Sequence, residues 1–184
     1  MRNVVLSIRR QLPLVLLGAG IAVSTLPNLA FSAGGEGGSN SIPTCTKGKV
    51  YDTRSKKCVS KNSSAVPDKD RTEYAYALTQ AGRYEEALEV LDTLKNPNTK
   101  EAWNYRGYAT RKLGRTDEGI SYYKKSVAID PKYAMVREYL GEAYVIKGQI
   151  DLAKKQLMVI KSICGTTCEE YEDLHEAIEN PSNI

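Results

Sequence analysis

The sequence predicts an all-α fold for most of the chain, and three observations support this class. From residue 68 onward, apolar residues recur at helical spacing, as in segment 84–91. Gly82, Gly114 and Gly148 lie 32 and 34 residues apart, where short turns between helices can use a left-handed backbone conformation. Almost no alternating strand pattern follows residue 60. We therefore expect a helix–turn–helix unit that is repeated along the chain.

The clearest copy of this unit spans residues 100–133. Its marked positions are Trp103, Gly107, Leu113, Gly114, Tyr123 and Pro131. They resemble the tetratricopeptide repeat, whose length is about 34 residues. The copy departs from that pattern at Arg106, Thr110, Gly119 and Ser126. The resemblance implies a right-handed superhelical array of about three repeats, at 68–99, 100–133 and 134–167. Gly107 and Gly141 are expected to let the second helix of a pair approach the first.

One more helix is expected after the third repeat. Residues 169–180 are acidic and place Tyr171, Leu174, Ala177 and Ile178 on one face. Repeat arrays need a terminal cap, because the last repeat otherwise leaves an apolar face in water. We interpret residues 168–180 as this C-terminal capping helix, and the predicted repeat domain spans residues 68–180.

The N-terminus has the order of an export signal. Arg2, Arg9 and Arg10 precede an apolar run over 12–26, and small residues lead up to Ser32. We predict a signal peptide over residues 1–32 with cleavage after Ser32, and hence a periplasmic or secreted protein with no remaining membrane span. The alternative is an uncleaved anchor, for which the run is short and is interrupted by proline and glycine.

The four cysteines suit an oxidising compartment, because their number is even and all follow the predicted signal. Three pairings are possible. Segment 45–58 has the pattern of a small hairpin, which favours the local pairs Cys45–Cys58 and Cys164–Cys168. A zinc site lacks ligands, since His175 is the one histidine, and a redox motif needs two intervening residues rather than three. We predict structural disulfides, no metal site and no cofactor.

Charge is distributed unevenly. The whole chain carries +4 and residues 1–32 carry three arginines, so the remainder is near +1, too neutral to indicate nucleic-acid binding. Basic residues crowd the hairpin, at Lys47, Lys49, Arg54, Lys56, Lys57 and Lys61. Acidic residues crowd the cap, at Glu169, Glu170, Glu172, Asp173, Glu176 and Glu179. Both ends are either solvated surfaces, or a basic module for an anionic envelope polymer opposite an acidic end for a basic partner.

The segment before the repeats, residues 33–67, is predicted to be a flexible leader that carries the hairpin. Its Gly/Ser-rich part at 33–43 and its polar part at 60–67 favour flexibility. No motif for nucleophilic or phosphate chemistry is present in the sequence, so we do not expect an enzyme.

The family resemblance implies a concave groove lined by the first helix of each repeat. The matching positions expected to bind a partner are Tyr76, Asn104, Tyr108, Arg111, Lys112, Glu138 and Glu142. Asn104, Tyr108 and Arg111 are expected on the surface, gripping an acidic side chain or terminal carboxylate and the adjacent peptide backbone. The carboxylate clamp of chaperone-binding members does not transfer, because its positions hold Thr72, Tyr76, Tyr105, Met135 and Tyr139.

The sequence thus predicts a non-enzymatic adaptor of the bacterial envelope that binds a protein or peptide. The alternative is a surface module whose basic hairpin binds peptidoglycan or anionic glycolipid. A redox carrier that uses Cys164 and Cys168 ranks last.

Overall fold

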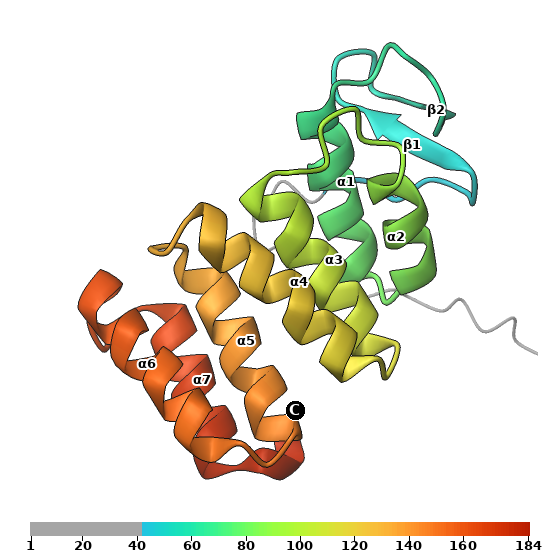
Figure 1. Cartoon of the computed structure of the whole chain (residues 1–184). Helices are drawn as coiled ribbons and strands as arrows, with labels where there is room; N and C mark the ends of the chain where they lie inside the picture. The colour runs from blue at the N-terminus through green and yellow to red at the C-terminus, as the bar shows by residue number, and fades with distance from the viewer. Residues whose placement is uncertain (1–41) are drawn as a thin grey trace, which may run out of the picture. The chain divides into compact units, whose positions relative to one another are not determined.

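The computed structural model describes residues 42–184, which belong to one compact unit. Two short strands precede seven α-helices and a final 3-10 turn in this part of the chain (Figure 1). The elements are β1 Lys49–Asp52, β2 Lys57–Ser60, α1 Asp68–Gln80, α2 Tyr84–Leu91, α3 Lys100–Lys112, α4 Thr116–Ile129, α5 Ala134–Ile146, α6 Ile150–Cys164, α7 Glu169–Glu179 and η1 Pro181–Asn183. The predicted all-α repeat fold with a small hairpin is confirmed. The predicted signal peptide lies outside the described residues.

The helices form three pairs, α1/α2, α3/α4 and α5/α6. Each pair is joined by a turn whose glycine has a positive φ, 71° at Gly82, 82° at Gly114 and 69° at Gly148. A residue with a Cβ is strained in this conformation, which explains the regular spacing of these glycines. Successive pairs stack through α2 with α3 and α4 with α5, and the buried residues form one core cluster around the first pair and another around α4, α5 and α6. No helix of the described part is long and apolar enough to cross a membrane.

Gly107 and Gly141 each allow a side chain of another helix to pack closely against them, and these side chains come from different helices. A Cβ at Gly107 would lie 2.6 Å from ring carbons of Tyr123, so α3 and α4 approach closely, as expected. At Gly141 the expectation is wrong. A Cβ there would lie 2.4 Å from Cδ2 of Leu174, which belongs to α7 rather than to α6. The cap helix α7 therefore packs into the space that the glycine leaves on α5.

The hairpin is docked on the first repeat. Its strands pair Val50 with Val59, and Cys45 is bonded to Cys58, as predicted. The backbone N–H of Cys45 donates to Oη of Tyr74 over 2.7 Å. Cys45 and Val50 are buried in one core cluster with side chains of α1 and α2.

Arg71 of α1 fixes the segment between the hairpin and the first helix. Its buried guanidinium donates to the carbonyl groups of Lys61, Ser63 and Val66 and to the hydroxyl of Thr93. The polar composition of residues 60–67 predicts a flexible tether, whereas these bonds hold the segment against α1 and α2. Composition does not reveal this, because the arginine that satisfies the carbonyls lies in the next element.

Candidate functional site

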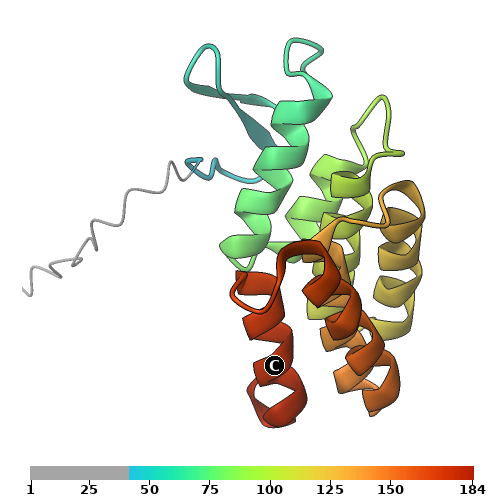
Figure 2. The same ribbon diagram turned by 90° about the vertical axis from the view of Figure 1, so that its left-hand side faces the viewer.

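The first helices of the pairs carry a row of tyrosines. Helix α1 contacts α3, α3 contacts α5, and α5 contacts α7. In Figure 2, α7 is the dark red helix on the left. Tyr76 of α1 stacks on Tyr105 of α3, with ring centroids 4.8 Å apart. Tyr108 of α3 contacts Tyr139 of α5 at 4.9 Å. We call the surface formed by these four half-buried rings the tyrosine face.

Sequence reasoning named two of the four rings. Tyr76 and Tyr108 are predicted groove residues. Tyr105 and Tyr139 are not; the sequence shows them only as residues that do not match the carboxylate clamp. The signal that would have found them is present, because Tyr105 and Tyr139 are separated by one repeat of 34 residues. Burial, followed by the charges of Glu169 and Glu138, raises the pKa of Tyr76 above its usual value.

Arg111 does not lie on the surface as predicted. It is 4% exposed, and its Nη2 donates to Oε2 of Glu142 over 2.5 Å. Its Nε donates to Oη of Tyr123 over 3.3 Å, and its guanidinium lies 5.4 Å from the ring centroid of Tyr108. The arginine is thus committed inside the protein, and it is not free to grip a ligand carboxylate. The reason is Glu142, which comes from the next repeat.

Asn104 and Glu138 occupy equivalent positions, one repeat apart, and both are buried. Asn104 is fully buried, which corrects its predicted direct contact with a ligand. Its Nδ2 donates to Oη of Tyr133 over 3.4 Å, and its Oδ1 has no hydrogen-bond partner in the described chain. Glu138 is 6% exposed and makes no hydrogen bond or ion pair with residues 42–184. Both side chains therefore lie under the tyrosine face.

Burial raises the pKa of Glu138 to about 9, and neighbouring carboxylates act in the same direction. These carboxylates are Glu142, Asp173, Glu170 and Glu169. Such a group is protonated near neutral pH, which lowers the cost of burying it. The cap helix α7 supplies three of the four neighbours, so it contributes acidic charge to this face.

Lys112 is the remaining predicted residue. It is exposed, and its Nζ lies 5.6 Å from the ring centroid of Tyr108. Burial and then the charge of Arg111 lower the pKa of Lys112. The structure therefore places Tyr76, Tyr108 and Lys112 where a ligand can touch them, and it places Asn104 and Arg111 beneath.

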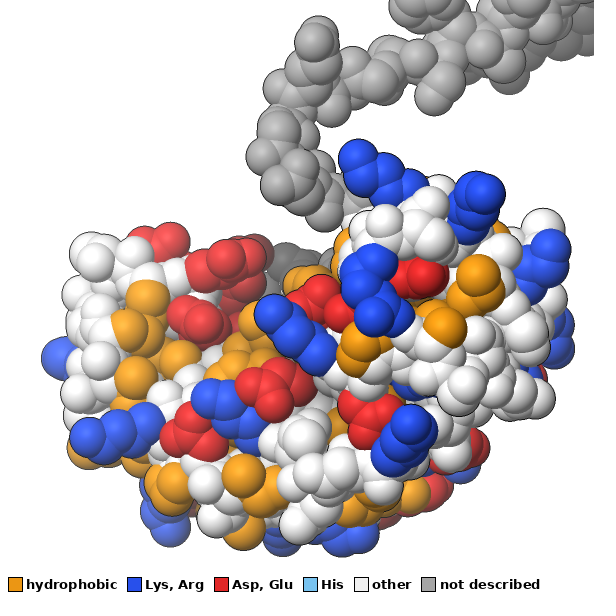
Figure 3. Space-filling view, turned by 90° about the horizontal axis from the view of Figure 1, so that it is seen from above, with side chains coloured by type: hydrophobic (Ala, Val, Ile, Leu, Met, Phe, Trp, Pro, Cys, Tyr) orange, Lys and Arg blue, Asp and Glu red, His pale blue; other side chains and the backbone are white. Residues whose placement is uncertain are grey.

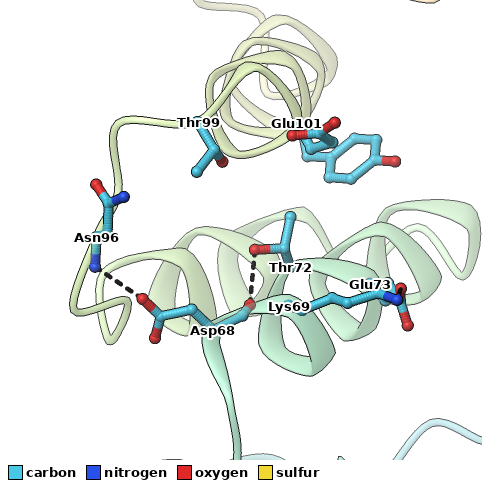
Figure 4. A pocket seen from close by; sticks show the side chains of 8 residues that line it. Asp68, Lys69, Thr72, Glu73, Asn96, Thr99 and Glu101 are labelled. Carbon is cyan, nitrogen blue, oxygen red and sulfur yellow. Dashed lines mark hydrogen bonds and ion pairs between the residues drawn. The ribbon is translucent and has the colours of Figure 1, made fainter.

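A pocket of about 450 Å³ opens between α1 and α3 (Figure 4). Its lining comprises Asp68, Lys69, Thr72, Glu73, Asn96, Thr99, Glu101 and Tyr105. The carboxylate of Asp68 accepts the backbone N–H of Asn96 over 2.7 Å, which fixes the loop at its rim. Glu73 pairs with Lys69 at 3.7 Å. Tyr105 joins this pocket to the tyrosine face, and the lining is acidic on balance.

A smaller pocket of about 190 Å³ lies between α5 and α7. It is lined by Glu142, Asp173, Glu176, Ala177 and Ile184. Burial, followed by Glu176, Glu172 and Glu170, raises the pKa of Asp173, so these carboxylates crowd one another. Figure 3 shows acidic side chains gathered at one edge of a hollow, with hydrophobic side chains next to them. Both pockets are thus acidic.

Comparison with known proteins agrees with this architecture. Residues 100–133 match the family described as tetratricopeptide repeat. The chain contains a tetratricopeptide repeat. Among solved structures it is similar to MamA, at 20% identity and a TM-score of 0.53, over 62% of this chain and 68% of MamA. It is also similar to the type III secretion translocator chaperone SycD of Yersinia enterocolitica, at 18% identity and a TM-score of 0.51, over 61% and 84% of the two chains. A search of curated proteins gave no match.

Two other candidate sites flank the helical array. In the hairpin, Lys47 and Lys61 pair with Glu89 at 3.7 and 2.5 Å, and Arg54 contacts Asp52 and the carbonyl group of Ala65. Half of its six basic side chains are therefore engaged internally, which leaves fewer for an anionic polymer.

The second of these sites is the Cys164–Cys168 pair. The two sulfurs are bonded to each other, as predicted. With Glu170 they form the one group in the described chain whose spacing suits a metal ion. A disulfide offers no thiolate to a metal, so we assign this pair a structural role.

Proposed function

We propose that this chain is a non-enzymatic adaptor that binds a protein or peptide through the tyrosine face. The observation that carries this proposal is the row of four half-buried rings across α1, α3 and α5, with a pocket at each end. Tyrosine offers a large contact area and a hydroxyl group at low entropic cost, which is why it is enriched at binding surfaces. The fold likeness to a translocator chaperone is in keeping with this role.

The test compares capture of partners by two variants. Tyr76→Ala with Tyr108→Ala removes one ring from each of the two tyrosine pairs, whereas Met158→Ser changes a side chain that is 72% exposed on α6. We expect proteins captured by the wild type from an envelope extract to be retained by Met158→Ser and lost by the tyrosine variant. Far-UV circular dichroism checks that all three proteins are folded. Equal capture by the tyrosine variant would reject the tyrosine face as the binding site.

We also propose that the protein is exported, with residues 1–32 as a cleaved signal. The order of basic, apolar and small residues supports this, and four cysteines bonded in two pairs suit an oxidising compartment. Intact-mass measurement of the exported protein is expected to give a chain that begins at Ala33 or within a residue or two of it. Retention of Met1 would favour the anchored alternative.

A further inference from the structure

We propose that the segment bound on the tyrosine face is an extended peptide rich in lysine or arginine. This inference rests on the proposed function and specifies the chemistry of the partner. It reverses the expectation from the sequence, which assigned the face to an acidic side chain or a terminal carboxylate. The first reason is that the guanidinium of Arg111 already forms an ion pair with Glu142 and is not available to a ligand carboxylate.

The charges left over around the face are mostly negative. Arg111 pairs with Glu142, and Lys69 pairs with Glu73. Lys112 makes no ion pair among residues 42–184, although the charge of Glu142 acts on it. Against it stand carboxylates of α7 that make no ion pair in the same range, at Glu169, Glu170, Asp173 and Glu176. An anionic peptide is repelled by this set, whereas a cationic one is attracted.

Glu138 gives a second and independent reason. Its side chain is more than nine-tenths buried, and no donor in the described part reaches its carboxyl group. Among residues 42–184, the fully buried side-chain atom without a hydrogen-bond partner is Oδ1 of Asn104, so the carboxyl group of Glu138 still touches solvent. It lies within electrostatic reach of Tyr76 on α1 and of Glu169, Glu170 and Asp173 on α7, so it faces the space between these helices. A carboxyl group that touches solvent and has no donor inside the protein can accept a hydrogen bond from a donor supplied from outside. A lysine or arginine side chain is such a donor.

The rings complete the chemistry. A cation over a tyrosine ring is attracted by the negative face of the π-system, and a carboxylate beside it adds a charge-assisted hydrogen bond. The protein already uses this combination internally, because Arg111 lies over Tyr108 and pairs with Glu142. A peptide arginine or lysine at the open side of the face can repeat the arrangement with Tyr76 or Tyr139 and the carboxylates of α7.

The experiment uses three fluorescein-labelled decapeptides and the protein with both disulfides formed, purified from the cells that produce it. One peptide alternates lysine with leucine, and the other two replace every lysine with glutamine or with glutamate. Fluorescence anisotropy is expected to show that the lysine peptide binds at least about tenfold more tightly than the glutamine peptide. The glutamate peptide is expected not to bind. Raising the salt concentration should weaken the lysine peptide most.

Matched variants locate the effect. Asp173→Asn with Glu176→Gln removes two carboxylates that line the pocket between α5 and α7 and should weaken the lysine peptide by about tenfold. Glu172→Gln with Glu179→Gln removes the same charge from exposed positions of α7 outside the pocket lining and should change affinity by less than about twofold. Circular dichroism confirms that each variant is folded.

Several outcomes would overturn the inference. These are equal or tighter binding of the glutamine or glutamate peptide, no binding of the lysine peptide at about 1 mM, or equal losses in both pairs of variants. Capture that still depends on Tyr76 and Tyr108 would then leave the proposed function standing with a partner of different chemistry. If capture does not depend on Tyr76 and Tyr108 either, both the tyrosine face as the binding site and the cationic peptide as its partner are rejected.

Discussion

Arg111 of α3 and Glu142 of α5 form an ion pair with an N–O distance of 2.5 Å, and this pair joins the second repeat to the third. The two side chains are 2% and 17% exposed, so solvent screens the pair little. Tyr123 contributes a third polar group from α4. The pair therefore lies where three helices meet, and its removal affects the stability of the array before it affects a ligand.

Arg111→Ala is predicted to lower the free energy of unfolding by about 3 kcal/mol, because it leaves the carboxylate of Glu142 without its cation in a poorly solvated site. Urea unfolding followed by circular dichroism measures this change. Lys112→Ala, next in the same helix but exposed, is the control and should shift stability by less than about 0.5 kcal/mol. The sequence alone predicts an Arg111→Ala variant that melts within a degree or two of the wild type. An unchanged variant would support that view and contradict the buried pair.

Glu138 predicts a pH dependence of stability. Its pKa is about 9 in the folded protein and near 4.5 when the chain is unfolded, so the folded state binds more protons between these values. Stability therefore falls as the pH rises through this window, by at most about 1.4 kcal/mol per unit from this one group. Glu138→Gln mimics the protonated form and should match the wild type near pH 4.5 but exceed it increasingly toward pH 9.

Urea midpoints at several pH values across that window check this prediction. The exposed variant Glu172→Gln is the control, and its difference from the wild type should stay nearly constant with pH. A Glu138→Gln curve that runs parallel to the wild-type curve would mean that the carboxyl group ionises normally in the folded protein.

The repeat architecture could be predicted from the sequence because its signals are local. Helical spacing, the turn glycines and the acidic segment with Leu174 on one face all lie within single elements, and the structure confirms them. The candidate site depends on contacts between repeats. Arg111 meets an acid 31 residues away, and Leu174 fills a space 33 residues back at Gly141. The pattern within one helix does not show which side chain of another repeat packs against it, so the sequence predicts Arg111 on the surface.

Gly141→Ala is predicted to destabilise the cap helix. In an exposed helix this change stabilises by about 1 kcal/mol, because alanine is the better helix former. Here the new methyl group would meet Leu174 at 2.4 Å, and we expect a net loss of about 1 to 3 kcal/mol. In a Leu174→Ala background the space is open, so the same change should be neutral or stabilising. Measured by urea unfolding, a stabilising effect in the wild-type background would show that α7 moves aside without cost.

The Cys45–Cys58 disulfide is predicted to stabilise the first repeat as well as the hairpin. The sequence alone predicts that reduction leaves the helical signal almost unchanged, because it treats the hairpin as tethered. In the structure Cys45, Val50 and Val66 share a core with Tyr74 and Leu78 of α1. Replacing both cysteines with alanine removes a closed loop that contributes about 3 kcal/mol in the chain-entropy model, and the loss should reach α1 through that core.

Thermal unfolding followed by far-UV circular dichroism tests this coupling. The helical signal of the Cys45→Ala, Cys58→Ala variant should melt at a lower temperature than that of the wild type. Replacing Cys164 and Cys168 is the control, because they are four positions apart and close a shorter loop, which contributes less, about 2 kcal/mol in the same model. If the hairpin and α1 share a core, unfolding of the hairpin must destabilise α1. A helical melting curve that is unchanged by loss of Cys45–Cys58 would therefore mean that the hairpin unfolds independently.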